Sequence, residues 1–271
     1  APDDTITFDV AGLGGLPAAG QVGAVSLTVT TEGVGDNGWV VVYAEDVSVT
    51  PDAISAHFMD GEEHSVGVLS RVSAGGQVKL TNHGHWLVDV TVDVTGWFSS
   101  TWGPSGGTLT PIDPLRVTGS APLAVASAST QDVTVAGVGD IPEDDVASVV
   151  ATVTVSDAAA DGPVVVYSTG EVSPPAAVSV WASTDGDRSS LVTVPVGSDG
   201  ALRVSNGTTG AVDVTLDVVG WVSGGDPSDA DGAAFHAVTP DVVFDSETVA
   251  ADVPETFAVP TTAVVPGEVA A

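Results

Sequence analysis

Hydrophobic and polar residues alternate along most of this chain. In residues 88–95 (VDVTVDVT), valine takes every second position and Asp or Thr lies between. A period of two places the valines on one face of a β-strand and the polar residues on the other, so the pattern predicts a strand with one face buried and the other in water. Residues 25–29 and 40–43 are similarly rich in valine, and no ten-residue stretch has the 3.6-residue period of a helix.

The same pattern occurs twice in the sequence. Residues 22–30 (VGAVSLTVT) return as residues 146–154 (VASVVATVT), an offset of 124 positions. A repeat of this length, carried by strands, predicts two copies of one β-module. The same offset relates residues 38–43 to 162–167, Asn82 to Asn206, and residues 88–97 to 212–221.

We therefore predict an all-β fold of two tandem antiparallel β-sandwich modules, jelly-roll-like, followed by a C-terminal tail that carries strands. The 32 glycines and 17 prolines supply the many turns that such modules need. The predicted boundaries are module 1 at 1–98, a Gly/Pro/Ser-rich linker at 99–109, module 2 at 110–222, an acidic linker at 223–235 and a partial third module at 236–271.

The two modules differ at their starts. Module 2 has a leading strand near residues 115–118 before the segment 131–137 (QDVTVAG). Module 1 begins with residues 5–12 (TITFDVAG), which match that later segment. We therefore expect module 1 to lack the leading strand and to expose an unpaired sheet edge, which is a site for binding another strand.

The C-terminal tail contains a segment that resembles the leading strand missing from module 1. Thr239 and Pro240 repeat Thr110 and Pro111, but the third module then stops, and a third of a module cannot bury its own apolar face. We expect the tail of one subunit to complete module 1 of the next, which generates a filament when the contact does not close. The alternatives left open are a tail that folds back onto its own module 1, caps module 2 or frays. The candidate subunit-contact residues are Val242, Val243, Phe244, Phe257 and Val259.

Three segments carry a family resemblance. SVVATVTV, GPVVVYSTG and LVTVPVGSDGALRVSNGTTGAVDVTLDVVGWV, with a leading strand of the form TP-x-R-V/L at residues 110–117, resemble the tandem β-modules of secreted and cell-surface proteins of actinobacteria. The resemblance covers almost the whole chain. It implies an extracellular, non-catalytic β-module and transfers no active-site residue.

The net charge of −31 changes the list of partners. Nucleic acid is excluded as a partner, because the phosphate backbone is held by clusters of Lys and Arg and the five cations here are scattered. Membrane insertion is excluded because no apolar stretch reaches 18 residues. An Asp-rich, Lys-poor surface favours a salt-rich habitat, and the opening residues APDD are typical of a mature secreted chain.

The candidate chemistry is limited. Asp226, Asp229 and Asp231 precede a glycine in one loop and make calcium the one cofactor to consider, against the favoured interpretation as a solvated linker. His83 and His85, with His57 or His64, are candidate transition-metal ligands, although exposed loop positions are favoured. No nucleophile elbow, phosphate loop or zinc-protease motif is present, so we do not expect an enzyme.

Six tryptophans remain, and we expect most of them to pack in the core. Trp86 and Trp102 have no counterpart in the other module and are candidates for glycan contact. The function we expect is an extracellular structural subunit that polymerises with itself, head to tail, into a fibre or surface layer. The alternative is a monomeric cell-surface module that binds a glycan or another ligand.

Overall fold

The computed structural model describes residues 4–13, 15–35, 37–51, 53–100, 107–175 and 177–224. These residues form antiparallel sheets without a helix, which confirms the predicted all-β fold. No helix in these ranges is long and apolar enough to cross a membrane. Trp102, the three carboxylates of the candidate calcium loop and the five candidate contact residues of the tail lie outside the described residues.

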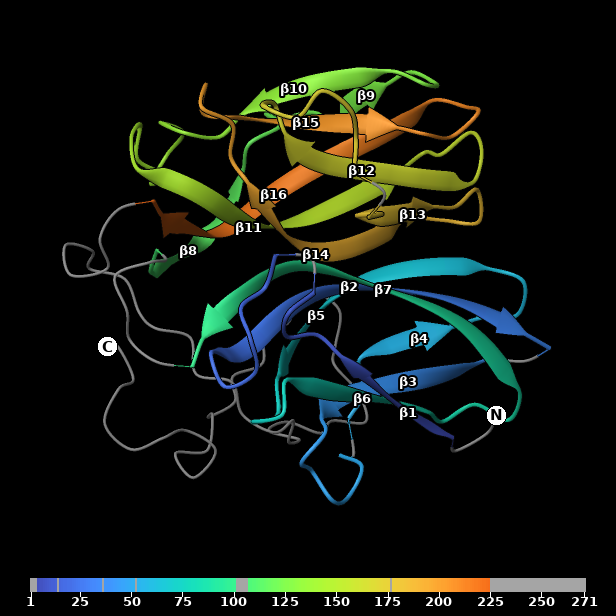
Figure 1. Cartoon of the computed structure of the whole chain (residues 1–271). Helices are drawn as coiled ribbons and strands as arrows, with labels where there is room; N and C mark the ends of the chain where they lie inside the picture. The colour runs from blue at the N-terminus through green and yellow to red at the C-terminus, as the bar shows by residue number, and fades with distance from the viewer. Residues whose placement is uncertain are drawn as a thin grey trace, which may run out of the picture.

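Module 1 consists of two sheets that face each other across a core. One sheet has the order β1-β6-β3-β4, and the other has the order β5-β2-β7. The chain crosses between the sheets several times, so strands distant in sequence become neighbours (Figure 1). The strands are β1 (Thr5–Asp9), β2 (Val22–Val34), β3 (Gly38–Ala44), β4 (Ala56–Phe58), β5 (Glu63–Arg71), β6 (Gln77–Asn82) and β7 (Leu87–Ser99).

Module 2 repeats this arrangement and adds two strands. Its sheets have the orders β10-β15-β12-β13 and β14-β11-β16-β8, and β9 also pairs with β16. Strands β1 to β7 therefore correspond in order to β10 to β16. The strands are β8 (Leu109–Arg116), β9 (Leu123–Val125), β10 (Thr130–Thr134), β11 (Val146–Ser156), β12 (Gly162–Ser168), β13 (Val180–Ala182), β14 (Arg188–Pro195), β15 (Ala201–Asn206) and β16 (Val212–Ser223).

The correspondence extends to an irregularity in the pairing. The register between β2 and β7 skips Thr95, and the register between β11 and β16 skips Val219, which is 124 positions later. A β-bulge at the same place in both modules means that both long strands bend at that point. The duplication inferred from the sequence is thus also a duplication of backbone geometry.

Each module has its own buried core, built mainly from valine. In module 1 the inward side chains of β2 meet those of β3 and β6, and Phe58 is the largest fully buried side chain. None of the five described tryptophans is fully buried and only Trp221 packs against a core, so the expectation that most of them pack inside was wrong. The sheets are filled by alternating valine, leucine and alanine side chains, and the indole rings lie at strand ends or on outward positions.

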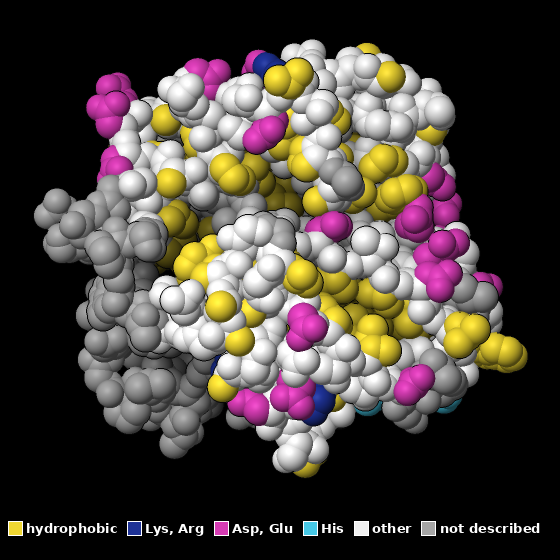
Figure 2. Space-filling model, viewed as in Figure 1, with side chains coloured by type: hydrophobic (Ala, Val, Ile, Leu, Met, Phe, Trp, Pro, Cys, Tyr) yellow, Lys and Arg dark blue, Asp and Glu magenta, His cyan; other side chains and the backbone are white. Residues whose placement is uncertain are grey.

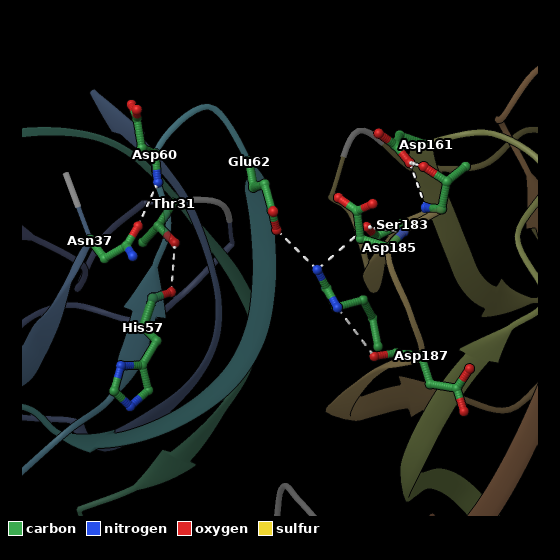
Figure 3. A network of polar contacts seen from close by, with 11 residues as sticks. Thr31, Asn37, His57, Asp60, Glu62, Asp161, Ser183, Asp185 and Asp187 are labelled. Atoms are coloured by element: carbon green, nitrogen blue, oxygen red, sulfur yellow. Dashed lines mark hydrogen bonds and ion pairs between the residues drawn. The ribbon is translucent and has the colours of Figure 1, made fainter. Parts of the chain in front are cut away.

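The modules pack against each other through β5 and β14 (Figure 1). The Gly67 amide donates a hydrogen bond to Ser190 Oγ at 2.9 Å, and Ser26 Oγ donates one to Thr193 Oγ1 at 3.3 Å. Arg188 Nη2 reaches Glu62 Oε2 at 2.9 Å, and Figure 3 shows Glu62 facing the loop of module 2 that holds Ser183. The junction is therefore largely polar.

Candidate functional site: the open edge of β7

The clearest difference between the modules lies at β7. In the described residues, β7 pairs with β2 and with no second strand, whereas its counterpart β16 pairs with β11 on one side and with β8 and β9 on the other. Residues 4–100 contain no strand that corresponds to β8 or β9. An unpaired edge presents a row of backbone N–H and C=O groups to solvent, ready to pair with another strand.

The backbone groups of Val92 point toward this edge. Its counterpart Leu216 accepts a hydrogen bond from the Val117 amide at 3.0 Å, and the Leu216 amide donates to Thr118 Oγ1 at 3.5 Å. Both groups of one strand residue lie on the same side of the strand. Val92 therefore presents its N–H and C=O to the position that the segment after β8 fills in module 2.

The hydrophobic face of β7 is also less covered than that of β16. Leu216 and its neighbours at every second position of β16 are fully buried. The matching residues of β7 are all at least partly exposed, and Val94 is 37% exposed. In the view of Figure 2, hydrophobic side chains lie open on the lower module, below β7 of Figure 1. The matched pairs are Val88 with Val212, Val90 with Val214, Val92 with Leu216, and Val94 with Val218.

The short strand β9 provides much of the cover in module 2. Val125 is completely buried in the core, and its carbonyl accepts a hydrogen bond from Asn206 Nδ2 at 3.0 Å. The sequence pattern did not predict β9, because three residues (LAV) are too few to show a period. The signal that could have found it is the apolar pair Leu123 and Val125, which flank Ala124 at strand spacing.

The other sheet edges in the described ranges are short or protected. Strands β1 and β10 have five residues, and β4 and β13 have three. Strands β5 and β14 face each other at the junction, and β8 contains Pro111 and Pro114, which cannot donate to a ladder. Strand β7 is 13 residues long and contains neither Pro nor Lys. It is the longest edge strand of the described part of the chain, and its protection consists of the bulge at Thr95 and the carboxylates of Asp89 and Asp93.

Charged side chains line the outward face of this sheet. Asp93 corresponds to Asp217, whose carboxylate binds Arg116 of β8 with Nε–Oδ1 at 2.9 Å and Nη2–Oδ2 at 3.0 Å. Burial raises the pKa of Asp93, and no cation pairs with it among the described residues. The expectation that this duplicated carboxylate is simply solvated is therefore only partly correct.

A second acidic row crosses the same sheet. Glu32 lies directly opposite Glu63 on one side and Asp89 on the other. Burial, and then the neighbouring Glu32 charge, raise the pKa of Glu63. Like charges that face each other across strands are destabilising, so added salt is expected to stabilise this face.

The histidine candidates do not converge on a metal site. No group of three His, Asp or Glu side chains in the described residues could hold a metal ion. His83 stacks on Trp39 with ring centroids 5.7 Å apart, and His57 lies opposite Trp39 on β4. His64 lies instead at the module junction, beside Arg188, where its Nδ1 has no hydrogen-bond partner in the described structure.

Trp86 is the most exposed described tryptophan, at 58%. The nearest atoms to a Cβ built at Gly35 are those of its indole ring, at 3.5 Å, so the ring lies over this glycine. Asn82 Nδ2 donates to the Trp86 carbonyl at 2.8 Å and fixes the loop. Trp86 adjoins the start of β7, so it lies at one end of the open edge.

Comparison with known proteins gives no match: no family model, no curated protein and no solved structure is significantly similar to this chain.

Proposed function

We propose that this protein is an extracellular structural subunit that assembles by adding a β-strand to the open edge of β7. The donor in this proposal is segment 236–271 of a second copy. The observation that carries the proposal is the difference between β7 and β16, because among the described residues the edge of this strand is paired in module 2 and unpaired in module 1. The extracellular setting is supported by the resemblance to actinobacterial surface modules.

The sequence of the donor segment matches the strand that covers β16 in two places. Thr239 and Pro240 repeat Thr110 and Pro111, which pair with Trp221 and Gly220. The fifth residue after the threonine is Leu115 in module 2 and Phe244 in the donor, so an apolar side chain occupies this position in both segments.

Burial of hydrophobic side chains at this edge would favour assembly. Full burial of one valine or leucine side chain contributes about 1.5–3 kcal/mol. The valines of β7 are already half buried, so covering each of them would contribute a fraction of this energy. Covering the exposed ring of Trp97 and forming new backbone hydrogen bonds would add to it. Head-to-tail donation leaves a free donor at one end and a free acceptor at the other, which gives an open filament.

The test is the particle size in high salt. Static light scattering on the intact chain is expected to give large assemblies, and a chain that ends at Gly232 is expected to stay monomeric. Val92→Pro removes an edge-facing N–H and is expected to prevent assembly. Val92→Ala keeps that N–H and is the matched control, expected to assemble at somewhat higher concentration.

Each other result has a clear meaning. An intact chain that remains monomeric contradicts the filament. If removal of the tail then also lowers the stability of module 1, the donor folds back onto its own module. Assembly that persists in Val92→Pro, with module 1 still folded by thermal unfolding, moves the contact away from β7 and contradicts the proposal.

Trp86 supports a second candidate function, glycan binding. Its ring is exposed, lies over Gly35 and is held by a fixed loop, and such rings stack on sugar faces. The counterpart in module 2 is Gly210, so the feature is specific to module 1. A glycan array that compares the intact chain with Trp86→Ala tests this function, and equal binding by both proteins contradicts it.

A further inference from the structure

The pairing of β8 with β16 includes one ion pair across the strands. Arg116 lies directly opposite Asp217, and both guanidinium contacts are hydrogen-bonding distances of 2.9 and 3.0 Å. Four residues lie directly opposite one another across the four strands of this sheet. In order they are Leu191, Thr152, Asp217 and Arg116. The strand that covers β16 thus contributes a cation at a defined place in the register.

The same row in module 1 stops at Asp93. It runs from Gly67 through Thr28 to Asp93, and Thr28 is only 2% exposed because module 2 packs over this region. Asp93 is itself partly buried, so its charge is less well hydrated than that of an ordinary surface carboxylate. The position opposite Asp93 is therefore sensitive to the charge that a partner strand brings.

The chain has no spare cation for this position. It contains five Lys and Arg residues, and all five have partners elsewhere. The pairs are Arg71 with Asp46, Arg116 with Asp217, Arg188 with Glu62, Arg203 with Asp132, and Lys79 Nζ with the Val47 carbonyl.

Segment 236–271 brings an acid instead. Arg116 is the sixth residue after Thr110, and the sixth residue after Thr239 is Asp245. If the donor paired with β7 in the register of β8 on β16, Asp245 would lie opposite Asp93 of the acceptor. Like charges directly opposite each other across strands are destabilising, and salt reduces the effect.

We propose that Asp93 sets the charge selectivity of the β7 edge: a strand with Lys or Arg opposite Asp93 pairs tightly, and the chain's own donor pairs tightly only where salt screens Asp93 from Asp245. This inference rests on the proposed function, because it assumes that β7 accepts a strand. It makes assembly of the natural protein increase with ionic strength, the reverse of the salt dependence of an ordinary ion pair.

Charge swaps on the intact chain test the selectivity. Asp245→Arg lies in the donor segment and alters none of the described residues. It is expected to lower the concentration for half-maximal assembly about tenfold in low salt and to remove the gain from added salt. Asp93→Arg is expected to do the same from the acceptor side, and Asp93→Arg with Asp245→Arg restores two like charges and the salt requirement.

Asp89→Arg is the matched control. Asp89 lies on the same face of β7, but its counterpart Asp213 is opposite Ala124 of β9 and not opposite Arg116, so residue 245 of the donor would not face it. The effect of Asp89→Arg is expected not to depend on residue 245. Thermal unfolding of each variant separates altered assembly from a damaged module.

The outcomes distinguish the inference from the function on which it rests. If no variant assembles at any salt concentration, the proposed function fails. If all variants assemble with the same salt dependence, strand addition stands and the role of Asp93 is overturned. If the double swap assembles as well as the single swaps, the two positions do not face each other and the register is wrong.

Discussion

Gly67 of β5 and Leu191 of β14 occupy the same position in the two modules and meet at the junction between them. A Cβ built on Gly67 would lie 1.7 Å from the carbonyl oxygen of Leu191. The two backbones therefore approach as closely as only a glycine permits. The Gly67 amide donates a hydrogen bond to Ser190 Oγ at 2.9 Å, so this backbone N–H has a partner at the contact between the modules.

Gly67→Ala is expected to force the modules apart. Because the obstructing atom is backbone, no side-chain rotation relieves the clash, and a loss of about 1–3 kcal/mol in the free energy of unfolding is expected. Gly96→Ala is the control, since the nearest atom to its added Cβ is 3.8 Å away. Urea unfolding followed by tryptophan fluorescence measures both, and equal losses would contradict the close contact.

Val90→Ala and Val214→Ala form a matched pair at equivalent positions. Val214 is fully buried, so its truncation is expected to cost about 2 kcal/mol. Val90 is partly exposed, and its truncation is expected to cost clearly less in dilute, unassembled protein. Urea unfolding of both variants checks this, and a loss at Val90 as large as at Val214 would mean that its face is already covered.

Asn206→Ala is expected to be among the more damaging single changes in module 2. The buried amide Nδ2 donates to three carbonyls, those of Val125, Ala126 and Gly210, and Oδ1 accepts the Thr208 amide at 2.9 Å. Loss of these partners is expected to cost about 2–4 kcal/mol. Asn206→Asp keeps the acceptor and loses the donors, so thermal unfolding should place it below the native protein as well. A neutral Asn206→Ala would contradict the importance of this network.

His64 is expected to make the junction sensitive to mild acid. Burial, and then the neighbouring Arg188 charge, lower the pKa of His64 below its usual value of 6.5. The folded protein therefore binds this proton more weakly than the unfolded chain, so the stability that His64 contributes is present above pH 6.5 and falls as the pH decreases.

The measurement is the free energy of unfolding between pH 7.5 and 5.5. The native protein is expected to lose more over this range than His64→Gln, which cannot titrate. Asp93 and Glu63 have raised pKa values in the folded protein. Their protonation therefore increases the free energy of unfolding as the pH falls, mainly at lower pH than the titration of His64. An identical pH dependence in both proteins would contradict the assignment to His64.

Much of the fold could be predicted from local pattern. The two-residue period predicts the strand at Val88–Val94. The offset of 124 makes β16 its counterpart in module 2, because duplicated strands keep the same inward residues. The same offset relates Asn82 to Asn206. The structure adds the reason, which is that each amide fixes the turn that follows it.

The junction could not be predicted in this way. Alternation assigns Ser26 and Thr28 to a solvent-facing side, yet both are buried because a second module covers them. Such cover depends on tertiary packing, which leaves no period in the sequence. Trp97 illustrates the opposite error: a repeated tryptophan suggests a core position, but the ring is partly exposed, and no described strand lies beside it as β8 lies beside Trp221.

The prolines of β8 bear on the shape of any assembly. Pro111 leaves the outer side of module 2 without a complete set of donors, and Pro240 repeats it in the proposed donor. A sheet completed by such a strand would have an outer edge that lacks backbone N–H donors, so a further strand would pair with it poorly. If the proposed assembly forms, its growth is expected to be confined to one dimension and to give a thread of separate subunits, because stacked ribbons need unprotected strand edges.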